Sequence, residues 1–255
     1  MGNRITYAFA SSYTGRGLFS CLAGMIDQLE RLVILKGFPG SGKSTLMRRT
    51  GLYLAEKGYE VQFWPSPLDP AYLQGIFLPR LKTAIIDENL PVEENRLQGV
   101  AVHYINLDSC LDEQQISGNQ QEIKLLASRM DDLLQGVYLK LNEMKHNKIQ
   151  LNSHYNNRLN LQKLEACSSD LIRRIIGSQD RERHFFASTI TSEGLFHYYE
   201  DITRDISNRY VLQGPPGQGK SWIMLSLARE SLERGHRVDF YHSGVDPDCI
   251  EVLVI

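Results

Sequence analysis

An internal repeat constrains the fold of this chain more than any other feature of its sequence. When the sequence is shifted against itself by 177 positions, residues 4–78 align with residues 181–255 without a gap, and 23 of the 75 pairs are identical. A gapless register over that length indicates a duplicated unit. We therefore expect two related modules in these 255 residues rather than one large domain.

The identical residues gather in three segments of each copy. A pattern F-A-S-x-x-T-x-x-G-L-F occupies residues 9–19 and returns at 186–196; a glycine-rich loop follows it, and a third pattern ends in Asp-Pro. After Leu78 the first copy continues into PRLKTAIIDENLP. In the second copy the partner of Leu78 is Ile255, the last residue of the sequence. The alignment thus predicts a second module that is truncated at its C-terminus.

The glycine-rich loop of the first copy has the sequence of a P-loop. The apolar run 32–36 indicates a strand, GFPGSGKST follows it, and residues 46–56 have a helical pattern. In this context G-x-x-x-x-G-K-[ST] cradles phosphate groups with its backbone N–H groups. Lys43 is predicted to reach the β and γ phosphates, and the Ser44 hydroxyl to bind Mg²⁺. The residues predicted to bind a nucleotide here are Gly37, Pro39, Gly40, Ser41, Gly42, Lys43, Ser44 and Thr45.

The second copy repeats this arrangement with one change. Residues 210–213 are predicted to form a strand, GPPGQGKSW follows, and a helix is expected through Glu233. Trp222 stands where the first copy has Thr45. The residues predicted to bind a nucleotide at this second loop are Gly214, Gly217, Gln218, Gly219, Lys220 and Ser221.

A carboxylate at the end of a neighbouring strand is needed to hold the Mg²⁺ ion of a P-loop enzyme. Residues 84–88, Ala-Ile-Ile-Asp-Glu, have the pattern of such a Walker B strand. Asp87 is predicted to position Mg²⁺, and Glu88 to orient an attacking water as a general base; a buried strand that ends in an acidic turn is the alternative. The predicted catalytic residues are Lys43, Asp87 and Glu88, and the predicted metal ligands are Ser44, Asp87 and Ser221.

Two other repeated features each allow two interpretations. Asp69 and Asp246, each followed by Pro, form either a turn or a second acidic site for substrate or Mg²⁺. The F-A-S-x-x-T segments form either an edge strand and a turn packed on the sheet, or a segment that brings Thr14 and Thr191 near the nucleotide. The sequence alone does not choose between these alternatives.

The segment between the copies is predicted to be a helical hairpin. Apolar residues recur at steps of three and four over 120–145, which indicates an amphipathic helix, and the polar stretch 146–157 is predicted to turn the chain. A second, antiparallel helix is expected from Leu161 to near Gly177. The predicted fold class is α/β: a duplicated P-loop NTPase fold with a parallel sheet. The first module spans 1–112, the hairpin insert 113–178 and the second module 179–255.

Composition excludes several classes of protein. The net charge of −2 provides no field for general nucleic-acid binding, and no apolar run approaches the ~20 residues of a membrane span. The four cysteines are far apart, which is typical of reduced thiols and favours a cytoplasmic location without a membrane partner.

With its two P-loops, its repeated F-A-S segment and its repeated Asp-Pro, the chain resembles a family of bacterial tandem P-loop ATP-binding proteins. Its members are described only as ATPases or as nucleotide-kinase-like proteins. The resemblance implies nucleotide-binding loops at 37–45 and 214–221. Hydrolysis at the second loop is in doubt, because Trp222 replaces a threonine and a second Walker B segment is missing.

The sequence therefore predicts a Mg²⁺-dependent ATPase with two tandem sites, in which hydrolysis is coupled to movement of the insert. ATP and Mg²⁺ are the expected cofactors. A small-molecule or nucleotide kinase is the first alternative. The second is a non-catalytic, ATP-gated interaction protein that binds a protein partner, or another copy of itself, through residues 120–176.

Overall fold

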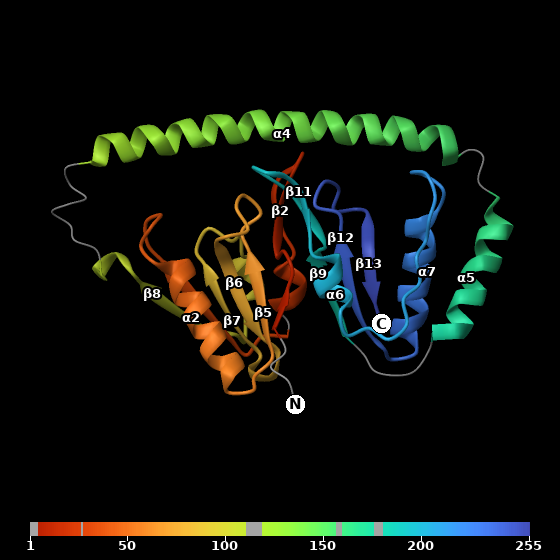
Figure 1. Cartoon of the computed structure of the whole chain (residues 1–255), viewed down its shortest axis with the longest axis horizontal. Coiled ribbons are helices and arrows are strands. Elements are labelled where there is room, and N and C mark those ends of the chain that lie inside the picture. The colour runs from red at the N-terminus through yellow and green to blue at the C-terminus, as the bar shows by residue number, and fades with distance from the viewer. Residues whose placement is uncertain (1–4, 27, 111–118, 157–159, 176–180) are drawn as a thin grey trace.

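The computed structural model describes residues 5–26, 28–110, 119–156, 160–175 and 181–255. The first module is built on a six-stranded sheet with helix α2 (Lys43–Glu56) packed against it (Figure 1). The strands lie in the order β1 (Ile5–Tyr7), β5 (Val61–Pro65), β6 (Leu73–Leu78), β7 (Thr83–Asp87), β4 (Arg31–Lys36) and β8 (Ala101–Asn106).

This sheet is mixed, so the prediction of a parallel sheet was wrong in part. The strands β7, β4 and β8 are parallel to one another, and β1 is parallel to β5, but β6 runs antiparallel to both β5 and β7. Only a short turn separates β5 from β6, and the single 3₁₀ turn η1 (Pro79–Leu81) separates β6 from β7. Connections this short join antiparallel strands, because a parallel pair needs a longer crossover.

The second module repeats the first, but only in part. Its three-stranded sheet has the order β13 (Ile250–Val254), β12 (Arg237–His242) and β9 (Arg181–Phe186), with β12 parallel to β9 and antiparallel to β13. Helix α7 (Lys220–Glu233) packs on this sheet and corresponds residue for residue to α2. The duplication inferred from the sequence is therefore confirmed in the folded chain.

The predicted strand at 210–213 was wrong. In the first module β4 is hydrogen-bonded on both sides, to β7 and to β8. The described part of the second module contains no strand that corresponds to either neighbour, and Val211 is 78% exposed. A strand needs partners for its backbone N–H and C=O groups, and here the segment has no sheet to join.

Two matching hairpins join the modules. The hairpin of β2 (Ser11–Thr14) and β3 (Gly17–Ser20) corresponds to that of β10 (Ser188–Thr191) and β11 (Gly194–His197). Between them Phe9 and Phe186 form an antiparallel bridge with N–O distances of 3.2 and 2.8 Å. The Ser12 and Thr189 hydroxyls lie 2.8 Å apart. Both contacts pair residues that correspond in the repeat, so the modules face each other about an approximate twofold axis.

The hydrophobic core crosses from one module to the other. The largest buried cluster contains Leu22 and Trp64 of the first copy together with Phe185 and Tyr241 of the second. The short helices α1 (Ala23–Ile26) and α6 (Tyr199–Thr203) both contribute to it. The remaining short elements are 3₁₀ turns in the first module: η2 (Glu94–Arg96) and η3 (Asp108–Cys110).

The insert consists of two helices, but they do not form the predicted hairpin. Helix α4 (Gln120–Asn156) crosses above both modules, and α5 (Leu161–Ile175) turns away from it and packs on α7 (Figure 1). The turn predicted at 146–157 was wrong, because the helix continues to Asn156. Contacts with the second module override the low helix propensity of this polar stretch. The predicted helix end near Gly177 lies outside the described residues.

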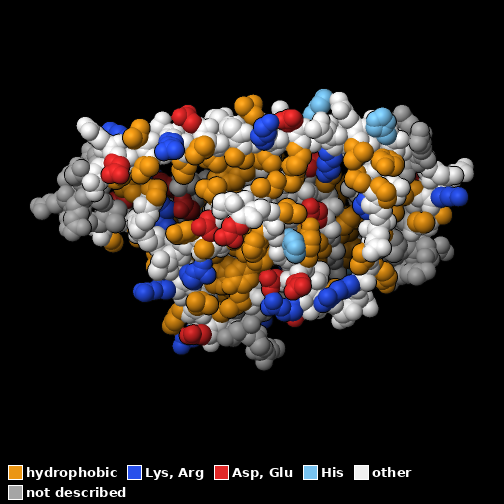
Figure 2. Space-filling view, turned by 45° about the horizontal axis from the view of Figure 1, so that its top comes forward, with side chains coloured by type: hydrophobic (Ala, Val, Ile, Leu, Met, Phe, Trp, Pro, Cys, Tyr) orange, Lys and Arg blue, Asp and Glu red, His pale blue; other side chains and the backbone are white. Residues whose placement is uncertain are grey.

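The predictions made from composition concern membrane spans, cysteines and charge, and each can be compared with the structure. No described helix combines the length and the apolar character that crossing a membrane requires. All four cysteines are free thiols, as predicted. On the face seen in Figure 2, basic and acidic side chains are interspersed, and hydrophobic side chains lie along α4.

Candidate functional site

The two glycine-rich loops have the same backbone conformation. Each follows the position of the central strand and ends at the first residue of a helix, Lys43 of α2 or Lys220 of α7. Three glycines of each loop adopt positive φ angles that side chains disfavour, which explains why the sequence requires glycine there. The φ angles are 144°, 88° and 93° at Gly37, Gly40 and Gly42, and 155°, 79° and 83° at Gly214, Gly217 and Gly219.

The lysine of each loop bonds to carbonyl oxygens at the start of its own loop. Lys43 Nζ donates to the Gly37 carbonyl and, at 3.4 Å, to the Phe38 carbonyl. Lys220 Nζ makes the corresponding bonds, at 2.7 Å to Gly214 and 2.8 Å to Pro215. Both lysines are thus held over the loop, where the oxygens of a phosphate group could accept hydrogen bonds from them.

Three carboxylates surround the first loop. Asp87 Oδ2, at the end of β7, lies 3.6 Å from Lys43 Nζ, and both side chains are largely buried. Glu88 Oε1 accepts a 2.8 Å hydrogen bond from Gly37 N, and Asp108 Oδ1 accepts one of 2.8 Å from Phe38 N. Because β7, β4 and β8 are parallel, their carboxyl ends meet at one edge of the sheet, and this brings the three acids to the loop.

The structure thus brings the predicted residues together at the first loop and adds a further acid, Asp108. Asp87, Glu88 and Lys43 meet as the sequence predicted, although the role of Glu88 as a general base stays a prediction. Asp108 was missed by the sequence analysis. Its signal was available: residues 101–106 form a strand-like run that Leu107 and Asp108 follow directly.

Two serines of the first loop bear on ligand binding. Ser41 Oγ is buried and has no hydrogen-bond partner among the described residues, and a bound phosphate oxygen would supply one. Ser44 Oγ accepts a 2.9 Å bond from Leu73 N of β6. A hydroxyl oxygen has a second lone pair, so this bond leaves Ser44 able to bind Mg²⁺ as predicted.

The described side chains do not form a metal site by themselves. Nowhere in the described ranges do three His, Cys, Asp or Glu side chains gather closely enough to hold a metal ion. The predicted ligands at the first loop, Ser44 and Asp87, nevertheless fit Mg²⁺. This ion keeps several waters and binds through one or two carboxylates together with substrate phosphates.

The repeated Asp-Pro segments are turns in both copies. Asp69 Oδ1 accepts a 2.9 Å bond from Ala71 N, and Asp246 Oδ1 accepts one of 3.3 Å from Asp248 N. Burial alone would raise the pKa of Asp246, but its bond with Cys249 and the charge of Lys148 outweigh this effect and lower it. The turn interpretation is confirmed, and it explains why the aspartate recurs.

The F-A-S-x-x-T segments form the two hairpins between the modules. Thr14 Oγ1 donates to Gly17 O at 3.0 Å, and Thr191 Oγ1 donates to Gly194 O at the same distance. Each threonine hydroxyl therefore closes the turn of its own hairpin. The interpretation as a strand and turn is confirmed, although the hairpins lie between the modules rather than at the edge of a sheet.

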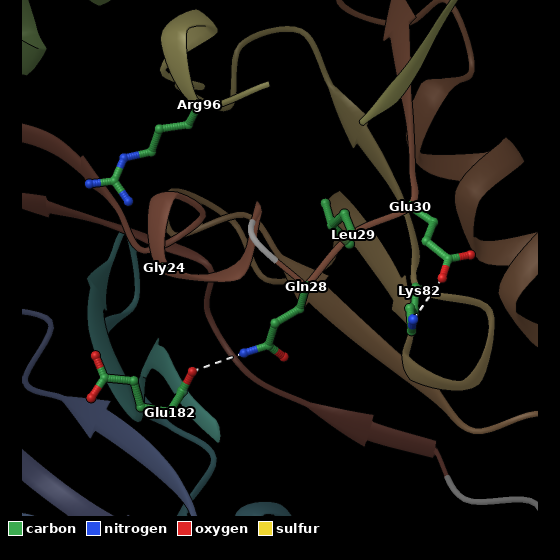
Figure 3. A pocket seen from close by; sticks show the side chains of 7 residues that line it. All are labelled: Gly24, Gln28, Leu29, Glu30, Lys82, Arg96 and Glu182. Atoms are coloured by element: carbon green, nitrogen blue, oxygen red, sulfur yellow. Dashed lines mark hydrogen bonds and ion pairs between the residues drawn. The ribbon is translucent and has the colours of Figure 1, made fainter. Parts of the chain in front are cut away.

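A hollow of about 480 Å³ lies at the opposite end of the first sheet (Figure 3). Glu30 precedes β4 and Lys82 precedes β7, so the hollow is at the amino ends of these strands, away from the first glycine-rich loop. Three of its charged side chains form ion pairs within the chain: Lys82 with Glu30 at 2.6 Å, and Arg96 with Glu93 at 2.9 Å. The fourth, Glu182, lies 3.5 Å from His184 Nε2. This arrangement leaves the hollow without an evident ligand.

Comparison of the chain with protein-family models, with curated proteins and with solved structures finds no match. The functional proposal therefore depends on the geometry of the loops and on the sequence patterns.

Proposed function

We propose that the first module binds ATP with Mg²⁺ and hydrolyses it. The observation that carries this proposal is the meeting of Lys43 and Asp87 at a glycine loop in which Gly37, Gly40 and Gly42 all have positive φ angles. Phosphoryl transfer needs little covalent chemistry from a protein; it needs positioning and neutralisation of charge. These residue types supply both.

Each residue has a distinct part in this proposal. Backbone N–H groups of residues 40–45 and the amino end of α2 hold the phosphates. Lys43 leaves its carbonyl partners for the β and γ phosphates, and Ser44 and Asp87 hold Mg²⁺, which neutralises phosphate charge when it is bound. Glu88 and Asp108 fix the start of the loop through Gly37 N and Phe38 N.

The long helix α4 offers a route by which a change at the loops reaches the insert. Tyr138 of α4 lies with its ring centroid 6.0 Å from that of Tyr13 in the first module. Lys148 lies 3.3 Å from Asp246 in the second module. A helix that contacts both modules responds to any shift between them, so we propose that hydrolysis is coupled to movement of α4.

Replacing Lys43 by alanine tests the first loop. Lys43→Ala is expected to weaken ATP binding about 10- to 100-fold, because a hydrogen-bonded charge at the phosphates is lost. Lys57→Ala, at the exposed end of the same helix, is the control and should bind as the unaltered chain does. Isothermal titration with Mg²⁺–ATP measures both, and equal affinities for all three proteins would show that the first loop is not the site.

Replacing Asp87 by asparagine tests the metal role. Asp87→Asn is expected to keep ATP binding but to lower Mg²⁺-dependent phosphate release at least about a hundredfold, since metal-assisted charge stabilisation contributes several kcal/mol. Asp69→Asn, in the turn after β5, is the matched control and should retain turnover. Turnover that survives in Asp87→Asn but fails in Asp69→Asn would move the metal role to Asp69.

Product analysis with labelled ATP separates hydrolysis from its alternatives. Release of inorganic phosphate without an added acceptor supports the ATPase. Labelled product only after addition of a nucleotide panel would establish a kinase instead. ATP binding without either product, combined with an altered protease pattern in 120–176, would establish an ATP-gated interaction protein.

A further inference from the structure

The two P-loops differ in what lies over their glycines. At Gly40 and Gly42 of the first loop, a Cβ atom built on the backbone would meet no atom of the described residues within 4 Å. At the corresponding Gly217 it would lie 3.1 Å from Asn152 O and from Tyr155 Cβ of α4. At Gly219 it would lie 2.7 Å from a methyl group of Leu164 in α5. We call Asn152, Tyr155 and Leu164 the α4–α5 cover.

Beyond these three residues, helix α5 also packs along helix α7. Helix α5 packs on α7 (Figure 1), and Ile223 and Leu227 of α7 are 8% and 7% exposed. Leu46, which corresponds to Ile223 in the first copy, is 39% exposed. The insert therefore buries a helix face beside the second loop that the first module leaves open.

Ion pairs hold the part of α4 that contributes to the cover against the second module. Lys145 and Lys148 of α4 lie 3.7 and 3.3 Å from the largely buried Asp246. Lys145 also lies 3.2 Å from Asp248. These ion pairs hold the carboxyl half of α4, and thereby Asn152 and Tyr155, close to the loop.

We propose that the α4–α5 cover closes the second P-loop, and that the phosphate chain of ATP enters this loop only when Leu164 moves away. The glycines of a P-loop allow phosphates to approach the backbone closely, and here the side chains of the insert occupy that approach. ATP and α5 thus compete for one surface. ATP therefore occupies the second loop only in the state in which α5 is displaced. This proposal rests on the proposed function for its ligand class.

Leu164→Ala tests the cover in a chain whose first loop is disabled by Lys43→Ala. The chain has two tryptophans: Trp64 is fully buried, and Trp222, in the first turn of α7 next to the second loop, is 39% exposed. Trp222 fluorescence during titration with Mg²⁺–ATP therefore reports on this loop. Removing the competing side chain is expected to increase the apparent affinity about tenfold, because the open state becomes more populated.

Two controls make the result specific. Leu161→Ala removes a leucine from the same helix that is 61% exposed, and it should leave the affinity unchanged. Adding Lys220→Ala to the Leu164→Ala chain should abolish the gain. Equal affinity with and without Leu164, whether tight or undetectable, would overturn the proposal. Circular dichroism of each variant checks that it folds.

Hydrogen exchange in the unaltered protein gives an independent measurement. Saturating Mg²⁺–ATP is expected to increase amide exchange in α5, and α5 that stays protected while Trp222 reports a bound nucleotide would contradict the proposal. The failure of the proposed function is distinguishable, because ATP binding by a Lys220→Ala chain depends on the first loop alone.

Discussion

Lys43 and Lys220 show how one sequence motif acquires different surroundings in the two copies. Both lysines bond to the first two carbonyl groups of their loops. Lys43 also has the carboxylate of Asp87 beside it and is 7% exposed. The motif determines the local bonds of each lysine, whereas strand β7 determines whether an acid stands next to it.

At the same scale, His242 should make stability depend on pH. Burial and the neighbouring His184, whose Nδ1 lies 2.8 Å from His242 Nε2, lower the pKa of His242 to about 4. An unfolded histidine titrates near pH ~6.5, so between these values the unfolded chain binds a proton that the folded chain does not. Stability should thus fall as the pH is lowered from about 6.5 to 4, by up to about 3 kcal/mol.

Denaturant unfolding at pH 7 and pH 4.5 measures this effect. His242→Asn should reduce the loss of stability between the two pH values, whereas His103→Asn, on the exposed side of β8, should not. An identical loss in all three proteins would show that His242 is not the responsible group.

At the scale of elements, Leu141 attaches the middle of helix α4 to the rest of the protein. Leu141 is 5% exposed, whereas Leu139, two residues away, is 72% exposed. Leu141→Ala is expected to cost about 2–5 kcal/mol, because it leaves a cavity between the helix and the modules. Leu139→Ala should change stability by less than about 0.5 kcal/mol.

Hydrogen exchange along α4 provides the measurement for both variants. Exchange should rise over much of α4 in Leu141→Ala and stay unchanged in Leu139→Ala. Similar exchange in the two variants would mean that other contacts, such as those of Lys145 and Lys148, hold the helix.

At the scale of the whole molecule, the shared core predicts a single unfolding transition. Leu22 and Trp64 of the first module pack in one cluster with Phe185 and Tyr241 of the second. Neither module can unfold without exposing this cluster, so the two should unfold cooperatively. Scanning calorimetry is expected to show one transition whose calorimetric and van't Hoff enthalpies agree. Two separated transitions would show that each module is stable without the other.

The sequence by itself determined the local parts of this protein. The 177-residue register predicted the matching elements of the two copies, and the glycine spacing predicted both loops. The strand that ends in Asp87 was also predicted correctly. These features depend on residues close together in the chain: glycines that tolerate positive φ, apolar runs and helix signals.

Tertiary structure decided the features that depend on distant partners. Residues 210–213 form no strand because they lack neighbours, and α4 continues through a polar stretch because the second module supports it. The meeting of Asp108 with the first loop depends on strand order. The position of Leu164 over Gly219 depends on the packing of α5 against α7. Sequence patterns describe what a segment can form, whereas strand pairing and side-chain packing between segments select the form that is stable.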